Sequence, residues 1–180
     1  VINYPVVAKI VSRDVIHKSD VGGVILNLKN KDELKEAYDR IIDNVKKKMP
    51  NALIEGIAVQ EMAPQGIEVI VGSTKDPQFG PTIMFGLGGI FVEIMKDVSF
   101  RIAPFSKSIA IEMINETKGK AILHGARGAK GGDIDKLAEA ISRISQLVTD
   151  FPEIKEFDAN PIMVYENGIK VVDARIILEK

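Results

Sequence analysis

Residues 154–178 read IKEFDANPIMVYENGIKVVDARIIL. Two β-type runs, 154–165 and 169–178, flank the dipeptide Asn167-Gly168. This dipeptide favours positive φ at both central positions of a hairpin turn, so we predict an antiparallel hairpin here. An antiparallel hairpin does not fit a doubly wound parallel sheet, in which strands are joined by crossover helices.

The rest of the chain is consistent with this class, because helical and β-type periodicities alternate along it. The predicted helices begin after Asn30, Ser106 and Asp133, and the first of them ends before Pro50. The predicted strands are 6–12, 22–28, 57–62, 67–73, 82–85, 90–95 and 100–103. We interpret the runs between 53 and 104 as a meandering antiparallel sheet. The order predicts an α+β fold and one domain over 1–180.

Composition excludes several classes of protein. The chain has 180 residues, of which 46% are hydrophobic and 27% charged, as in globular domains. No apolar run approaches the ~20 residues of a spanning helix. The net charge is -1 with both signs interspersed, so we expect neither nucleic acid nor membrane as a partner. The absence of cysteine and of a signal-peptide pattern favours a cytoplasmic location.

The hairpin also predicts which residues face each other. If Asn167 and Gly168 alone form the turn, residue 166 pairs with 169, and paired numbers always sum to 335. Asp173 then lies opposite Ile162. Because side chains alternate between the two faces of a strand, the register decides which polar groups meet.

Three oxygen-bearing side chains meet in that register. Asp158, Asn160 and Ile162 share a face, and Asp173 lies on the same face, diagonally across from Asn160. Hard cations such as Mg²⁺ bind one or two such side chains together with phosphates and water. The alternative is a solvated polar face on an edge hairpin, although Asp and Asn are poor strand formers.

A second candidate site is the loop 14–23, which contains His17, Lys18 and the pair Gly22-Gly23. Glycines let a backbone approach a ligand closely, lysine attracts phosphate, and histidine can act as nucleophile, base or phosphate contact. Lys9 interrupts the preceding apolar strand, and a buried lysine needs an anionic partner. The alternative is an ordinary turn with a surface histidine. Arg101 and Arg127 are weaker candidates for phosphate contacts.

Two common nucleotide motifs are excluded. The segment Gly86-Leu87-Gly88-Gly89 lacks the final glycine of a dinucleotide fingerprint and precedes a strand-like run. No glycine-rich stretch ends in Gly-Lys-Ser/Thr, so a P-loop is absent from the sequence.

Five segments together resemble one known family. They are VVAKIVS (6–12), IHKSDVGGV (16–24), DPQFGP (76–81), FGLGGIFVE (85–93) and FDANP (157–161). They are similar to the ATP-grasp β subunit, or domain, of ADP-forming acetate-CoA ligase (acyl-CoA synthetase, NDP-forming). The resemblance covers essentially the whole chain.

The resemblance implies an ATP-grasp fold in which two lobes clasp nucleotide. We expect a nucleotide-binding lobe with the β-rich middle at about 1–105 and a second lobe with the closing hairpin at about 106–180. Family members usually carry several tens of residues before the Pro-Val-Val strand. This sequence starts almost directly at that strand, so we expect part of the usual N-terminal segment to be missing.

The resemblance also assigns roles to particular residues. It places Lys9 on the nucleotide phosphates, Gln60-Glu61-Met62 at the adenine and Glu68 near the ribose. Lys18, Gly22 and Gly23 stay candidates for covering the phosphates on the argument from residue types given above. Asn160 and Asp173 match the family's metal-binding pair for Mg²⁺, with Asp158 as their neighbour.

The family reaction converts acyl-CoA, ADP and phosphate into a carboxylic acid, CoA and ATP through a phosphohistidine. His17 matches the histidine that receives the phosphoryl group, and a CoA-binding α subunit or domain is the implied partner in a hetero-oligomer. One alternative is a non-catalytic regulatory ATP-grasp module of a fused protein. Another is a ligase acting on its own small acid, in which His17 would have no evident role.

Overall fold

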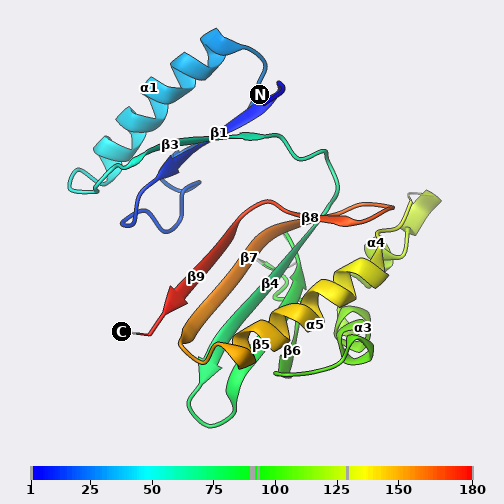
Figure 1. The fold of residues 1–180 in the computed structure, drawn as a ribbon. Coiled ribbons are helices and arrows are strands. Elements are labelled where there is room, and N and C mark those ends of the chain that lie inside the picture. Colours follow the sequence, from blue (N-terminus) through cyan, green and yellow to red (C-terminus); the bar gives the residue numbers. More distant parts are fainter. Residues whose placement is uncertain (1, 90–91, 93, 129, 180) are drawn as a thin grey trace. The chain divides into compact units, whose positions relative to one another are not determined.

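The computed structural model describes residues 2–89, 92, 94–128 and 130–179, and the chain divides into two compact units, Val1–Pro64 and Gln65–Lys180 (Figure 1). The predicted lobe boundary near residue 105 falls inside the second unit, between strand β6 (Val98–Ile102) and helix α3 (Lys107–Glu116).

The first unit is a three-stranded antiparallel sheet with one helix. The sheet has the order β2-β1-β3, formed by Val24–Leu28, Val6–Val11 and Gly56–Glu61. Helix α1, Lys31–Lys48, packs Ala37, Ile41 and Val45 against Val6, Ala8 and Ile10. The predicted cap is confirmed, because the Asn30 side chain accepts hydrogen bonds from the amides of Asp32 and Glu33, both 3.0 Å long.

The second unit is a larger antiparallel sheet in the order β6-β5-β4-β7-β8, with β9 also paired to β7 (Figure 1). The strands are β4 (Ile67–Asp76), β5 (Gly80–Leu87), β6 (Val98–Ile102), β7 (Ile154–Val164), β8 (Ile169–Val171) and β9 (Ala174–Leu178). The helices are α3 (Lys107–Glu116), α4 (Lys120–Leu123), the 3-10 turn η1 (Ala126–Gly128) and α5 (Ile134–Asp150). The α+β class is confirmed.

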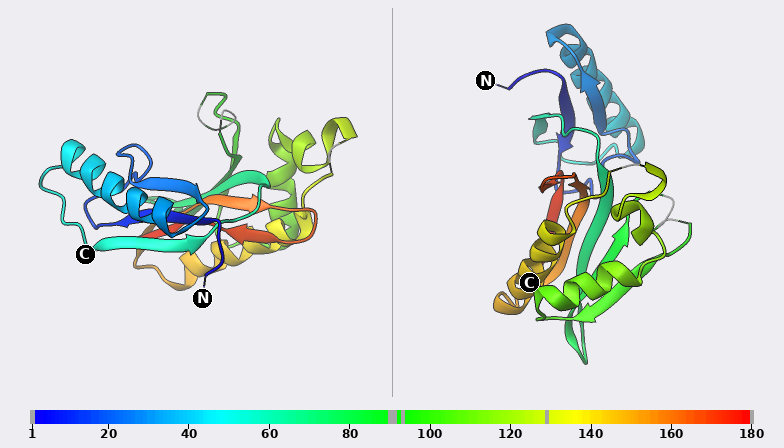
Figure 2. Two further views of the ribbon diagram at one scale, coloured as in Figure 1. Left: turned by 90° about the horizontal axis from the view of Figure 1, so that it is seen from above. Right: turned by 90° about the vertical axis from the view of Figure 1, so that its right-hand side faces the viewer.

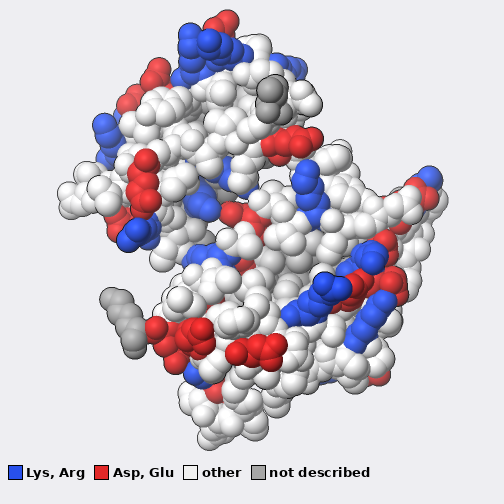
Figure 3. All heavy atoms as spheres, viewed as in Figure 1, with Lys and Arg blue, Asp and Glu red and all other residues white. Residues whose placement is uncertain are grey.

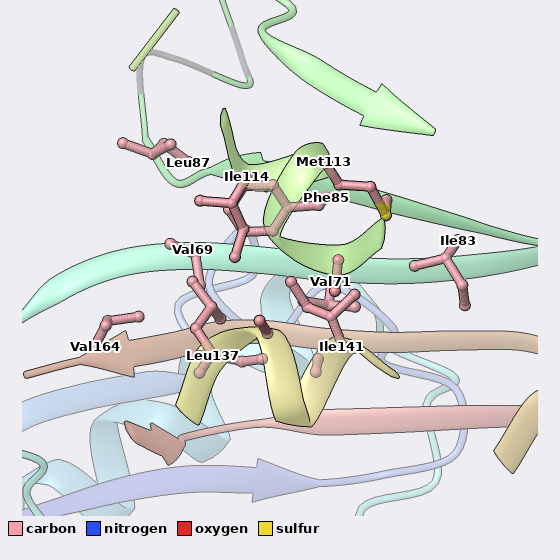
Figure 4. Packing of buried hydrophobic residues seen from close by; sticks show 14 of the residues in the cluster. Val69, Val71, Ile83, Phe85, Leu87, Met113, Ile114, Leu137, Ile141 and Val164 are labelled. Atoms are coloured by element: carbon pink, nitrogen blue, oxygen red, sulfur yellow. The ribbon is translucent and has the colours of Figure 1, made fainter. Parts of the chain in front are cut away.

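Helices α3 and α5 pack on one face of this sheet (Figure 2). The core between them contains Val69 and Val71 of β4, Phe85 of β5, and Leu137 and Ile141 of α5, all fully buried (Figure 4). Residues at i, i+1 and i+4 form the apolar stripe of α5, while β4 alternates with period two. The opposite face of the sheet therefore carries the alternate residues of each strand.

Two strand predictions need correction. The run 57–62 does not join the meander with β4, because β3 pairs with β1 in the other sheet. The predicted strand 90–95 lies partly outside the described residues; of its described members, Val92 is helical and Ile94 and Met95 form a turn. Periodicity identifies apolar runs but does not say which sheet a strand joins.

Asp133 holds the hairpin turn to the start of α5. Its carboxylate accepts the Lys136 amide (3.0 Å) as the helix cap and the Gly168 amide (2.8 Å) from the turn. These two backbone hydrogen bonds, the Lys136 amide first, lower the pKa of Asp133.

Replacing Asp133 by Asn should therefore change the pH dependence of stability. Asn keeps a carbonyl oxygen for the cap but loses the charge and an acceptor for Gly168. A depressed pKa stabilises the fold above the unfolded value of about 3.8, and this contribution is lost as pH falls through the folded pKa. Thermal unfolding should show the variant several degrees less stable than the parent at pH 7, with the gap closing at acid pH. The control Asp135→Asn removes the neighbouring exposed carboxylate. A difference in melting temperature between Asp133→Asn and the parent that does not change with pH would contradict the role given to the Asp133 charge.

Candidate functional site

His17 lies at the exposed middle of a loop that its own backbone keeps compact. The Gly22 amide donates to the Ser19 carbonyl (3.0 Å), and the Gly23 amide donates to the Lys18 carbonyl (2.7 Å). Val15 is 3% exposed and anchors the loop in the core of the first unit. The imidazole is thus accessible to a reactant while its backbone is fixed.

The glycine pair in this loop has a packing role within the first unit. Gly22 has φ +70°, and a Cβ there would lie 2.7 Å from Nδ2 of Asn44. A Cβ on Gly23 would lie 2.6 Å from Cγ2 of Ile10. A side chain at either position would therefore displace a neighbour. Contact of the pair with a ligand stays a prediction.

Lys9 is held on the face of the small sheet opposite α1. Its strand neighbours Ala8 and Ile10 pack in the helix-facing core, so the lysine side chain leaves from the other face. Lys9 is only 6% exposed. The strand therefore holds a lysine of which little is exposed to solvent.

The segment 60–62 lies at the end of β3, beside Lys9. Gln60 pairs with Val7 and so shares the Lys9 face, whereas Glu61 pairs with Val6 on the α1 face. The Met62 amide donates to the Pro5 carbonyl at 3.2 Å. The first unit thus brings Lys9 and Gln60 onto one face, as residues that act on one ligand would require.

In the second unit, Glu68 lies on the sheet face away from α3 and α5. Its neighbour Val69 is buried in the core, while Glu68 is exposed. The Gly88 amide donates to the Glu68 carbonyl at 2.7 Å, and a Cβ on Gly88 would lie 2.9 Å from Cβ of Glu68. Gly88 is therefore required for the turn after β5 to cross beside Glu68.

Asn160 and Asp173 lie directly opposite each other. The Asn160 amide donates to the Asp173 carbonyl at 3.0 Å, and the Val172 amide donates to the Pro161 carbonyl at 3.0 Å. Asp173 lies at the interruption between β8 and β9. Asp158, two residues before Asn160, pairs with Gly72 on one side and Arg175 on the other. These residues lie together on neighbouring strands.

The predicted hairpin register was wrong by two residues. The Tyr165 amide donates to the Gly168 carbonyl (3.0 Å), so 166 and 167 form the centre of the turn, and paired numbers sum to 333. Of the predicted pair, Gly168 has a positive φ, of 87°, and Asn167 does not. In this turn the Gly168 amide donates its hydrogen bond to the Asp133 carboxylate. Since the error is an even number, Asp173 stays on the predicted side and lies directly across from Asn160, not diagonally.

Ile162 does not share the face of Asp158 and Asn160. It is fully buried with Ala159, because Val69 pairs with Ile162 and Val71 with Ala159. Two residues, 160 and 161, therefore face the single residue 70 of β4, which is a β-bulge. The bulge lets core packing continue on both sides of the polar pair.

Arg101, one of the two arginine candidates for phosphate contacts, is engaged by a carboxylate. Arg101 forms an ion pair with Glu116 at the end of α3. The hydrogen bond from Arg101 lowers the pKa of Glu116, and the same bond raises the pKa of Arg101. The Arg127 side chain lies outside the described part of the structure. Sequence reasoning missed Arg175 opposite Asp158, which the corrected register would have identified.

Charge and donor chemistry narrow the possible ligands. On the face drawn in Figure 3, Lys and Arg lie among Asp and Glu, which does not suit binding of a nucleic-acid backbone.

Over the described residues, no three His, Cys, Asp or Glu side chains gather as a metal cluster. Asp158, Asp173 and Asn160 contribute two carboxylates and an amide, and such oxygen donors fit Mg²⁺. None of the described helices combines the length and apolar character of a membrane span.

Comparison with known proteins gives one consistent result. The ATP-grasp domain family matches residues 1–178. Subunit beta of the ADP-forming acetate–CoA ligase I of Pyrococcus furiosus is 55% identical over 177 residues, which are 98% of this chain and 76% of that protein. The ADP-forming acetate–CoA ligase I of Archaeoglobus fulgidus is 54% identical, and the match spans 98% of this chain but 26% of that protein.

Solved structures agree with these relatives. One is the dinucleotide-forming acetyl-coenzyme A synthetase 1 of Ca. Korarchaeum cryptofilum with coenzyme A and Ca-AMPCP, with a TM-score of 0.95 and 55% identity over 99% of this chain and 78% of that one. Another contains coenzyme A and Mg-AMPPCP, with its phosphohistidine segment pointing towards the nucleotide binding site. Its TM-score is 0.83 with 50% identity, over 98% of this chain and 78% of that chain.

Proposed function

The chain belongs to the ATP-grasp domain family, alongside the β subunits of ADP-forming acetate–CoA ligases, and on this premise we propose that it is the nucleotide-binding part of such an enzyme. The proposed overall reaction is acyl-CoA, ADP and phosphate to carboxylic acid, CoA and ATP. The observation that carries the proposal is the family match over residues 1–178 together with 55% identity to a named β subunit. The resemblance supplies Lys9, His17, Asn160 and Asp173 as the proposed site residues.

A CoA-binding partner would complete the enzyme. The P. furiosus relative is named as subunit beta, and the A. fulgidus relative extends well beyond the part that this chain matches. We therefore propose a hetero-oligomer with a CoA-binding α subunit or domain, acting in the cytoplasm. The acyl group would be selected mainly by that partner.

The contacts with the nucleotide are proposed residue by residue. Lys9 would neutralise phosphate charge, supported by its low exposure of 6% and its fixed strand position. Gln60, Glu61 and Met62 would contact the adenine, and Glu68 the ribose. Lys18, Gly22 and Gly23 would cover the phosphates, with the glycine backbone already fixed by the bonds of the loop.

Asp173, Asn160 and Asp158 would hold Mg²⁺. The oxygen donors fit a hard cation that takes its remaining ligands from phosphate and water. When bound, the ion would supply positive charge that stabilises the transferring phosphoryl group. The structure of the Korarchaeum enzyme with Mg-AMPPCP supports this choice of metal.

His17 would carry the phosphoryl group. An imidazole nitrogen attacks the terminal phosphorus of ATP, a P–N bond forms, the bond from that phosphorus to the bridging oxygen breaks, and ADP leaves with the electron pair while the ring proton goes to solvent. Its exposed position on a fixed loop supports transfer onward to a partner. Reversal of these steps makes ATP from ADP.

Calorimetric titration of the purified chain tests the nucleotide role. We expect ADP and ATP to bind with Kd of about 1–100 µM in Mg²⁺, and at least about 10-fold more weakly in EDTA. The carboxylates of Asp158 and Asp173 would hold the ion, and its positive charge would attract the nucleotide phosphates, which explains the expected loss. No binding under either condition would contradict the proposal and favour the regulatory-module alternative. Addition of a CoA-binding partner should then give turnover.

A further inference from the structure

The C-terminal half of α1 braces the loop that carries His17. Asn44 and Lys48 are four residues apart and so lie on one face of the helix. Nδ2 of Asn44 donates to the Gly22 carbonyl at 3.3 Å, and Nζ of Lys48 donates to the Asp20 carbonyl at 2.6 Å. Two side chains of one helix thus hold two carbonyls of one loop.

Gly22 makes this brace possible. Its φ of +70° turns the backbone into a conformation that side chains disfavour, and the missing Cβ leaves the space in which Asn44 sits. The Ile10 amide donates to the Gly23 carbonyl at 2.7 Å. Strand β1 therefore holds Gly23, while helix α1 holds the adjacent Gly22. The loop is therefore fixed on its C-terminal side.

The N-terminal side of the loop is fixed separately. Oδ2 of Asp14 accepts the Leu53 amide at 2.7 Å, and Val15 is buried. His17 lies between the two anchored sides, next to Ile16, which is 56% exposed. Movement of the imidazole therefore depends on how well each side is held.

We propose that Asn44 and Lys48 are positioning residues for phosphoryl transfer through His17, an inference that rests on the proposed function. Phosphoryl transfer depends mainly on alignment of the attacking atom, and a misplacement of about 1 Å can cost about 100-fold in rate. Lys48 is exposed, so solvent weakens its bond, whereas Asn44 is half-buried. The two together are needed for a clear effect.

The test compares the full chain carrying N44A and K48M with a matched control, K46M and K47M. The control removes two other cations of the last helical turn and so tests the loss of charge alone. Amide exchange by NMR should be roughly 5-fold or more faster for Gly22 and Gly23 in N44A/K48M than in the control. Thermal unfolding verifies that both variants are folded.

The same variants are then incubated with Mg-ATP and assayed for phosphohistidine at residue 17. We expect N44A/K48M to react about 5- to 20-fold more slowly at saturating Mg-ATP, a condition that separates the rate of transfer from nucleotide affinity. Lys48→Arg, which keeps a donor for the Asp20 carbonyl, should retain most of the rate.

The outcomes separate the two proposals. Unchanged exchange at Gly22 and Gly23 would refute the brace. Faster exchange with an unaltered rate of phosphohistidine formation would refute its positioning role. A parent protein that never forms phosphohistidine, even with a CoA-binding partner, would refute the proposed function, and the exchange comparison would still decide whether α1 braces the loop.

Discussion

His17→Asn should reduce phosphoryl transfer by at least about 1,000-fold while leaving the Kd for Mg-ADP within about 2-fold of the parent. Asn has a comparable polar side chain but no nucleophilic ring nitrogen, so the P–N bond cannot form. The imidazole is exposed and does not pack in the core, so the free energy of unfolding should not change. Acid-labile phosphate on the protein, measured after incubation with Mg-ATP, reports the loss directly.

The chain offers a matched control in its second histidine, His124. It is also exposed, and its Nε2 lies 2.9 Å from Oδ1 of Asn115 near the end of α4. His124→Asn should leave phosphate incorporation unchanged. Equal loss in the two variants, or phosphate retained in His17→Asn, would mean that another residue carries the phosphoryl group.

Asp173→Ala should weaken nucleotide binding in Mg²⁺ by about 10-fold, close to the loss expected on removing the ion with EDTA. The substitution removes one of the two carboxylates near Asn160 and therefore a charged ligand of the proposed ion. Because the Asp173 carbonyl, not its side chain, accepts the Asn160 amide, the hairpin pairing should persist. Calorimetry in Mg²⁺ and in EDTA measures the effect, which should be confined to the Mg²⁺ condition.

Two further variants refine that test. Asp173→Asn keeps an oxygen ligand without the charge and should give an intermediate loss. Asp150→Ala removes an exposed carboxylate at the end of α5, which accepts a hydrogen bond from Gln146, and should not alter nucleotide affinity. A loss in Asp173→Ala that is equally large in EDTA would point to disturbed folding and away from a metal ligand.

Most of the fold could be predicted from the sequence, because local patterns determine it. Asn30 and Asp133 cap the helices as predicted, since each has a short polar side chain just before an apolar stripe. The pairing of β3 with β1 could not be predicted, because an apolar run contains no information about its neighbour in space. The hairpin was predicted correctly, but its register was not.

The error in register shows what the turn dipeptide could not reveal. Asn167-Gly168 suits a two-residue turn, but the Gly168 amide is bound by Asp133, which is 35 residues away in sequence. A contact so distant in sequence is not visible in a local motif. The role of Asn44 and Lys48 was not predicted for the same reason, because their partners are backbone carbonyls of a loop that precedes the helix.

The bulge at residues 160 and 161 determines what would have to be moved if this hairpin were transplanted. Residues 160 and 161 lie opposite 173 and 172, so the extra residue in β7 is matched by one in the neighbouring edge strand. A deletion in one strand alone would move Asp173 away from Asn160, whereas a deletion in both would keep the sheet and erase the polar pair. A protein engineer who grafts this feature elsewhere would therefore have to transplant both strands.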